Sequence, residues 1–197
     1  MKIKNIAPDV VQLKFYQEKT DSDYGSCLWG NVIIDCANYT LLVESDCGSY
    51  AYGWTPTPNT ESFIRLLCRM NSDYLLGKIS DMTCFDFEKS KEQTYENIRE
   101  YFEYDDINAA NEIIENLDYV LDASYSEESF YRVCEEAFYG YNACDSFEII
   151  HIEKDYPAGA KKIAEIFKNT IQPYLRENFL SEEEKEDARD FVQGEMG

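Results

Sequence analysis

The first quarter of the chain alternates between apolar and polar positions, which is the pattern of strands with one buried face. In the first such segment the apolar side chains are Val11, Leu13 and Phe15. Because the links between segments are short, we predict an antiparallel meander. Its strands would span residues 11–17, 27–35, 39–44 and 49–54. Thr55-Pro-Thr-Pro58 would end it, since proline cannot donate to a β-ladder.

Beyond residue 60 the apolar spacing becomes mostly helical. Thr60 can cap a helix in which Phe63, Leu67 and Met70 recur at helical intervals. Two further short strands are predicted, at residues 83–87 and 146–152. The remaining helices are predicted at residues 88–104, 106–122, 126–138, 157–179 and 181–193.

This order of elements indicates an α+β fold, in which an N-terminal antiparallel β-meander packs against a mostly helical C-terminal half. The 197 residues fit one domain, 1–197. Within it we distinguish a sheet-rich part, 1–87, from a helix-rich acidic part, 88–197.

The composition limits the partners that the chain can bind. Acidic residues number 39 against 18 Lys and Arg, which gives a net charge of −21. Because 44% of the residues are apolar and 15% aromatic, we expect a folded protein. Phosphate groups are bound by Lys and Arg, so direct binding to nucleic acid or to an anionic membrane surface is disfavoured.

Half of this net charge, −11, lies between residues 88 and 137. In a helix, side chains four residues apart share one face, about 6 Å apart along the axis. One row of acidic side chains with this spacing consists of Glu88, Glu92, Glu96, Glu100 and Glu103. The next predicted helix can present a second group, made of Glu112, Glu115, Asp118 and Asp122.

Two interpretations of these acidic helices compete. They can form the solvated face of an acidic protein, which is the ordinary role of charge runs. Alternatively, they form a ridge complementary to the basic groove of a nucleic-acid-binding protein. A calcium loop is a weaker alternative, because Asp21-Ser-Asp23 matches only the opening of the EF-hand pattern.

The cysteines predict reduced thiols and no metal or cofactor. There are seven, at positions 27, 36, 47, 68, 84, 134 and 144, without a CxxC pair, and a single histidine accompanies them. We find no secretory signal and no run of apolar residues long enough to span a membrane. The expected location is therefore the cytoplasm.

Any Cys/His or Ser/His catalytic scheme must use His151, the only histidine. In a strand over residues 146–152 its side chain would share the face of Ile149, which favours a packed histidine. An enzyme would need Cys27 or Cys47 within hydrogen-bond reach of His151. No Walker A motif and no GxGxxG occurs, and we expect that the protein is not an enzyme.

Three aromatic residues, Tyr50, Tyr52 and Trp54, share one face of the fourth predicted strand. We expect this face to pack against the helices, because aromatic side chains dominate protein cores. If it is exposed instead, it is an alternative contact surface for a protein partner.

Parts of residues 11–87 resemble a family of small acidic proteins of phages and mobile elements of Gram-positive bacteria. The resemblance rests on Asp21-Ser-Asp-Tyr-Gly-Ser-Cys-Leu-Trp29, on Glu44-Ser-Asp-Cys-Gly-Ser-Tyr-Ala-Tyr-Gly-Trp-Thr-Pro-Thr-Pro58 and on Glu61-Ser-Phe63. Some acidic proteins of such elements resemble anti-CRISPR inhibitors, which occupy the nucleic-acid groove of an RNA-guided nuclease. The resemblance implies this setting and supplies no catalytic residues.

Charge and resemblance together predict an acidic binding protein that inhibits a nucleic-acid-processing effector, with an RNA-guided DNA nuclease as the first candidate. It would occupy the basic nucleic-acid groove of this effector with the acidic residues named above. The alternatives are an inhibitor or adaptor that binds elsewhere on a protein, an enzyme using a cysteine with His151, and an acidic accessory protein.

Overall fold

The computed structural model describes residues 9–56, 61–102, 107–139 and 146–185. The chain divides into two compact units. Unit 1 consists of Met1–Asp81 together with Tyr156–Gly197, and unit 2 consists of Met82–Asp155. Unit 2 is therefore an insertion between two sequence segments of unit 1.

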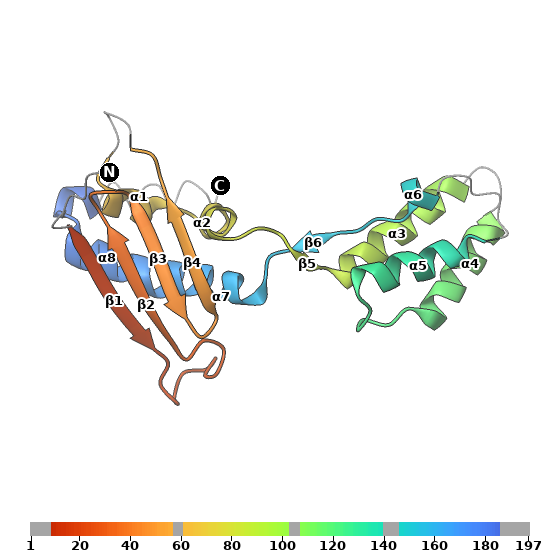
Figure 1. Cartoon of the computed structure of the whole chain (residues 1–197), viewed down its shortest axis with the longest axis horizontal. Coiled ribbons are helices and arrows are strands. Elements are labelled where there is room, and N and C mark those ends of the chain that lie inside the picture. Colours follow the sequence, from red (N-terminus) through yellow and green to blue (C-terminus); the bar gives the residue numbers. More distant parts are fainter. Residues whose placement is uncertain (1–8, 57–60, 103–106, 140–145, 186–197) are drawn as a thin grey trace, which may run out of the picture. The chain divides into compact units, whose positions relative to one another are not determined.

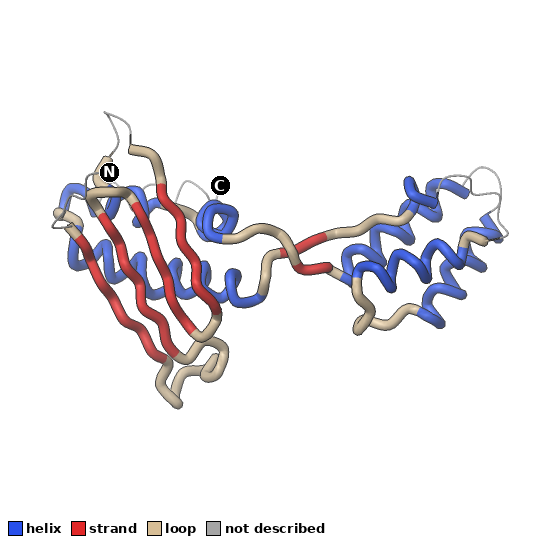
Figure 2. The backbone as a smooth tube through the Cα atoms, viewed as in Figure 1, coloured by secondary structure: helices blue, strands red, loops and turns tan. Residues whose placement is uncertain are grey.

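Unit 1 contains the four-stranded antiparallel sheet (Figures 1 and 2). Its strands follow in chain order and are β1 (Val10–Tyr16), β2 (Trp29–Asp35), β3 (Thr40–Ser45) and β4 (Gly48–Gly53). Each strand pairs with the next one along the chain, with register partners such as Leu13 with Val32 and Val43 with Tyr50. The predicted meander is confirmed.

Helices cover one face of this sheet, and Figure 1 shows the long C-terminal helices crossing behind the strands. They are α1 (Phe63–Arg69), α2 (Ser72–Ile79), α7 (Ala158–Ile166) and α8 (Gln172–Phe179). Val32 and Leu41 of the sheet are buried in one cluster with Phe63, Leu67 and Phe167 of the helices. The N-cap of α1 is Ser62, whose side chain accepts from the Arg65 amide, whereas the predicted cap, Thr60, lies outside the described residues.

The predicted helix over residues 157–179 contains a π-helical turn, η1 (Phe167–Ile171), between α7 and α8. The Gln172 amide donates to the Phe167 carbonyl, five residues back. Pro173 follows at the start of α8 and has no amide hydrogen to donate. The wider turn therefore lets the helix continue past a proline.

Unit 2 consists of helices closed by a two-stranded ribbon. The helices are α3 (Phe87–Phe102), α4 (Ile107–Val120), α5 (Glu127–Ala137) and the single turn α6 (Ser146–Ile149). The strands β5 (Cys84–Phe85) and β6 (Lys154–Asp155) pair antiparallel and bring the two ends of the unit together. Ile98, Ile113, Leu117 and Phe130 are buried at the centre of its core.

The strand predicted over residues 146–152 is wrong. The structure has a helical turn, α6, at Ser146–Ile149, and the only strand of this region in the described chain is β6. Ile149 and Ile150 are both buried, although an alternating strand would send one of them to the solvent. Of the helix predicted over residues 181–193, residues 182–185 are helical and the rest lies outside the described residues.

The α+β class, with a sheet first and mostly helices after it, is confirmed. The single domain, 1–197, stays a prediction. The inner division at residue 87 also stays a prediction, and the structure places α7 and α8 in the compact unit of the sheet. In the described part of the chain, no helix has the length and apolar character needed to cross a membrane.

Candidate protein-binding surface

Most of the negative charge belongs to unit 2. Its sequence, 82–155, holds 20 acidic and five basic residues, so it carries −15 of the total charge of −21. The sheet-bearing unit 1 accounts for the remaining −6. The charge excess is therefore concentrated on one compact helical unit.

Four predicted ridge residues lie along the outer side of α3, and their side chains are exposed: Glu88, Glu92, Glu96 and Glu100. The opposite side of α3 buries Tyr95, Ile98 and Phe102, as expected from the helical spacing. We call these four glutamates the α3 ridge. Glu103, the fifth predicted member, lies outside the described residues.

The four acidic residues predicted on the next helix are also exposed, but they differ in their surroundings. Glu112 and Glu115 lie on α4. Asp122 follows α4 and accepts from the Ser124 amide at 2.8 Å, an interaction that shapes the turn. Asp118 connects two helices and is the most constrained of the four.

Asp118 joins α4 to α3 through two side chains. Its Oδ1 atom lies 2.7 Å from Lys91 Nζ and accepts from the Tyr95 hydroxyl at 2.9 Å. These partners, Lys91 first, lower the pKa of the Asp118 carboxyl. Burial, with the neighbouring carboxylate second, raises the pKa of Tyr95. Asp118 thus stabilises the helix pair and is less available to a partner than the α3 ridge.

The cations of unit 2 leave the α3 ridge uncompensated. The described ion pairs of its lysines are Lys89 with Asp86 at 3.3 Å, Lys91 with Asp118, and Lys154 with Glu127 at 3.1 Å. Within the described ranges, no ion pair involves a ridge glutamate. Like charges four residues apart repel by about 0.2–0.5 kcal/mol per pair, so the helix tolerates this row at a cost to its stability.

A shallow hollow of about 280 Å³ borders the α3 ridge. Glu92 and Glu96 line it together with His151 and Glu153 from the segment after α6. His151 Nε2 lies 3.0 Å from Glu153 Oε2, and the His151 side chain is 41% exposed. The expectation of a packed histidine is therefore wrong: the backbone around His151 is fixed, whereas its ring faces the acidic hollow.

The segment that carries His151 is held by three polar side chains of α3, which the sequence analysis missed. Thr94 Oγ1 accepts from the His151 amide at 3.0 Å, Ser90 Oγ accepts from the Glu153 amide at 2.8 Å, and Asn97 Nδ2 donates to the Ile149 carbonyl at 3.0 Å. We call this set the α3 ladder. The only sign of the α3 ladder in the sequence is that Ser90, Thr94 and Asn97 place polar side chains on the side of α3 that otherwise faces the core.

The aromatic face of β4 packs against the core of its own unit. Tyr50, Tyr52 and Trp54 are half-buried and pack against the core of unit 1. Trp54 lies 5.4 Å from Phe63 and 4.7 Å from Tyr52, measured between ring centroids. The expectation that this face packs against the helices is confirmed.

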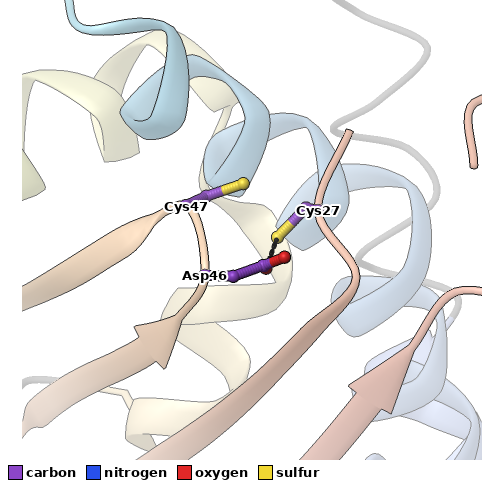
Figure 3. A group of neighbouring side chains, drawn as sticks. All are labelled: Cys27, Asp46 and Cys47. Atoms are coloured by element: carbon purple, nitrogen blue, oxygen red, sulfur yellow. Dashed lines mark hydrogen bonds between the residues drawn. The ribbon is translucent and has the colours of Figure 1, made fainter. Parts of the chain in front are cut away.

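Among the described residues, one group of side chains could hold a metal ion: Cys27, Asp46 and Cys47 in unit 1 (Figure 3). The calcium alternative at Asp21 and Asp23 loses its support. Asp21 Oδ2 accepts from the Glu18 amide at 2.8 Å, and Asp23 Oδ2 lies 2.6 Å from Lys162 Nζ. Both carboxylates are thus occupied by the fold of their own unit.

The two cysteines considered as nucleophiles belong to unit 1, whereas His151 belongs to unit 2. In the described chain, the hydrogen-bond partners of Cys27 and Cys47 are other residues of unit 1. Acidic side chains, Lys89 and Gln93 are the other residues lining the hollow of His151. Among the described residues, no cysteine lines the hollow of His151.

Comparison with known proteins relates the chain to a protein family. A model of a phage family matches residues 1–177 of the chain, which include all of unit 2. No curated protein and no solved structure matches. The match thus extends over both the sheet and the acidic helices.

Proposed function

Because the chain belongs to a phage protein family, we propose that it binds a nucleic-acid-processing effector of the bacterial host and inhibits it. The acidic unit 2 would occupy the basic groove in which the effector normally holds nucleic acid. The first candidate effector is an RNA-guided DNA nuclease, which would make the protein an anti-CRISPR inhibitor acting in the host cytoplasm. On the resemblance described above, the proposed host is a Gram-positive bacterium.

The α3 ridge is the observation that carries the proposal. Its four carboxylates are exposed, follow one another about 6 Å apart along a helix, and have no described ion-pair partner. A row of this kind offers a basic groove a regular series of negative charges, as a nucleic-acid backbone does. Acidic residues that served only solubility would need no such alignment.

The net charge of −15 on unit 2 would also steer the encounter. Complementary fields accelerate association, and salt screens them with a Debye length of about 8 Å at physiological ionic strength. We therefore expect the association rate to fall steeply as salt is added. The dissociation rate should depend less on salt, because it is governed by the short-range contacts in the complex.

Exposed aromatic side chains near the carboxylates can supply the specificity that charge lacks. Tyr101 follows the ridge on α3 and is 41% exposed, and Tyr119 on α4 is 91% exposed. Aromatic residues are enriched among the side chains that dominate binding energies. They are more exposed than the half-buried aromatic face of β4.

The first experiment is affinity capture from a bacterial lysate with three forms of the full chain. The ridge variant carries Glu92→Lys, Glu96→Lys and Glu100→Lys. The matched control carries Glu128→Lys, Glu135→Lys and Glu136→Lys, which are exposed positions on α5 with the same total change in charge. We expect a nucleic-acid-processing protein that the wild type and the control retain at moderate salt and the ridge variant loses.

The captured effector is then purified and assayed with and without its nucleic acid already bound. An inhibitor that occupies the groove loses potency on the preloaded effector, and the ridge variant is inactive in both orders of addition. Equal potency in both orders would place the contact away from the groove, as in the adaptor alternative. Equal loss in the ridge and control variants would contradict the α3 ridge as the contact.

The enzyme alternative has its own control. The variant His151→Ala removes the only imidazole of the chain. Full inhibition by this variant is expected from a binding protein, whereas loss of inhibition with retained binding would favour catalysis.

A further inference from the structure

Three potential metal ligands meet at one end of the sheet of unit 1. Cys27 lies just before β2, and Asp46 and Cys47 form the turn between β3 and β4. The two sulfurs and a carboxylate oxygen all lie within 4.8 Å of one another. Figure 3 shows the Cys27 side chain directed at the Asp46 carboxylate, with Cys47 beside them. Two separate parts of the chain thus contribute to one cluster.

The Asp46 carboxylate is held in place by backbone amides. Its Oδ2 accepts from the Leu28 amide at 2.9 Å, and its Oδ1 accepts from the Trp29 amide at 3.3 Å. Oδ1 also lies 3.4 Å from Cys27 Sγ. Hydrogen bonds of this kind fix the orientation of a carboxylate ligand in a metal site.

The turn that carries Cys47 is equally constrained. Its amide donates to Ser45 Oγ at 3.1 Å, and its carbonyl accepts from the Tyr50 hydroxyl at 2.9 Å. Gly48, with φ of 123°, supplies the left-handed conformation that closes the turn. Gly159 of α7 packs so closely on the Cys47 carbonyl that a side chain would not fit between them. The positions of the ligands are therefore set by the fold rather than by a free loop.

We propose that Cys27, Asp46 and Cys47 bind one zinc ion through two sulfurs and one carboxylate oxygen. Thiolate ligands favour zinc over magnesium or calcium, and a tetrahedral zinc site with Zn–S distances of about 2.3 Å places its sulfurs about 3.8 Å apart. The three ligand atoms of the cluster lie within 4.8 Å of one another, so each separation has to shorten by about 1 Å at most. Because Asp46 is exposed, water can complete the tetrahedron from the solvent side.

Zinc binding at this cluster is a proton exchange. Each cysteine sulfur loses its proton to the solvent when it forms a bond to the ion, and no oxidation takes place. Two thiolates and one carboxylate then place three negative charges around the Zn²⁺ ion. The site would join the start of β2 to the β3–β4 turn, so the ion should stabilise unit 1.

The test uses the full, metal-free chain with a phosphine reductant, and Co²⁺ as a spectroscopic probe. We expect one Co²⁺ per chain, with the sulfur-to-cobalt charge-transfer band and the visible bands of a tetrahedral site, and displacement by Zn²⁺. Cys47→Ser and Asp46→Asn should each weaken binding about tenfold or more. Cys84→Ser, which removes an exposed thiol of unit 2, is the matched control and should bind as the wild type does.

A second measurement guards against variants that misfold. In the wild-type chain, Zn²⁺ should slow the alkylation of Cys47, detected by mass spectrometry of the peptide, and leave that of Cys84 unchanged. Absence of stoichiometric binding, or binding that Cys47→Ser and Cys84→Ser reduce equally, would overturn the site. So would equal protection of Cys47 and Cys84, since it would reflect a general effect of the ion.

Discussion

Thr94 and His151 exchange two hydrogen bonds across 57 residues of sequence. The Thr94 hydroxyl accepts from the His151 amide at 3.0 Å and donates to the His151 carbonyl at 3.3 Å. The Thr94 side chain thereby satisfies the backbone amide and carbonyl of His151, as a neighbouring strand would in a sheet. The arrangement keeps the segment straight while leaving the imidazole beside Glu92 and Glu96.

The first prediction concerns this pair. Thr94→Val keeps the shape of the side chain and removes both hydrogen bonds, so unit 2 should lose about 1–3 kcal/mol of stability. Urea unfolding followed by circular dichroism measures the change. Thr83→Val, at an exposed position of the same unit, should change the stability by less than about 0.5 kcal/mol. Similar losses in the two variants would show that the α3 ladder does not support the segment.

The second prediction concerns pH and Asp118. Because Lys91 and Tyr95 lower the pKa of its carboxyl in the folded state, this carboxylate stabilises unit 2 above the ordinary pKa of 3.8. The contribution is lost as the pH falls through the lowered value. Asp118→Asn should therefore cost up to about 1 kcal/mol at neutral pH, since the pair is partly exposed. The difference from wild type should shrink below pH 3.8, and a difference that grows there would contradict the assignment.

The third prediction concerns the close contact between α7 and the turn after β3. A Cβ atom on Gly159 would clash with the Cys47 carbonyl oxygen, which belongs to the backbone and cannot rotate away. Gly159→Ala should therefore destabilise unit 1 by about 1–3 kcal/mol. Gly53→Ala is the matched control, because its Cβ would meet Thr40 Oγ1 at an ordinary 3.4 Å. Thermal unfolding compares them, and equal melting temperatures would refute the close approach.

The fourth prediction concerns the thiols of unit 2. Burial raises the pKa of Cys134 from its ordinary 9.0 to about 12, which lowers its thiolate fraction at neutral pH about a thousandfold. Cys84 is exposed. Iodoacetamide should therefore modify Cys84 long before Cys134 in the native chain, as read by mass spectrometry of the peptides. In urea the two rates should converge, whereas comparable native rates would mean that the core of unit 2 opens readily.

The sequence predicts the elements well where one periodicity dominates. The alternation of Val11, Leu13 and Phe15 identifies β1, and the spacing of Tyr95, Ile98 and Phe102 identifies the buried side of α3. It fails at residues 146–152, because apolar alternation does not reveal that Ser90 and Thr94 satisfy this backbone. The spacing of apolar residues also cannot show that α7 and α8 pack on the sheet. Their position depends on which apolar faces come together in the fold.

The same limits apply to the sites. The spacing of the α3 ridge follows directly from helical geometry, so its exposed glutamates could be named in advance. Cys27 and Cys47 are separated by a strand pair, and only the register of β2, β3 and β4 brings them together. Their spacing matches no metal-binding motif, so the cluster emerges only from the fold.

The placement of unit 2 between residues 81 and 156 also determines the order in which contacts become available during translation. The ribosome releases β1–β4 with α1 and α2 first, then the whole acidic unit, and only afterwards α7 and α8. Unit 2 can close its β5–β6 ribbon at once. Unit 1 waits for long-range contacts such as the hydrogen bond that the Gln172 side-chain amide donates to the Leu67 carbonyl of α1, 105 residues earlier. Domains generally fold as units as they emerge. The acidic helices of unit 2 should therefore be folded before α7 and α8 can pack on the sheet. The nascent chain would then carry a folded unit 2 while the sheet still lacks α7 and α8.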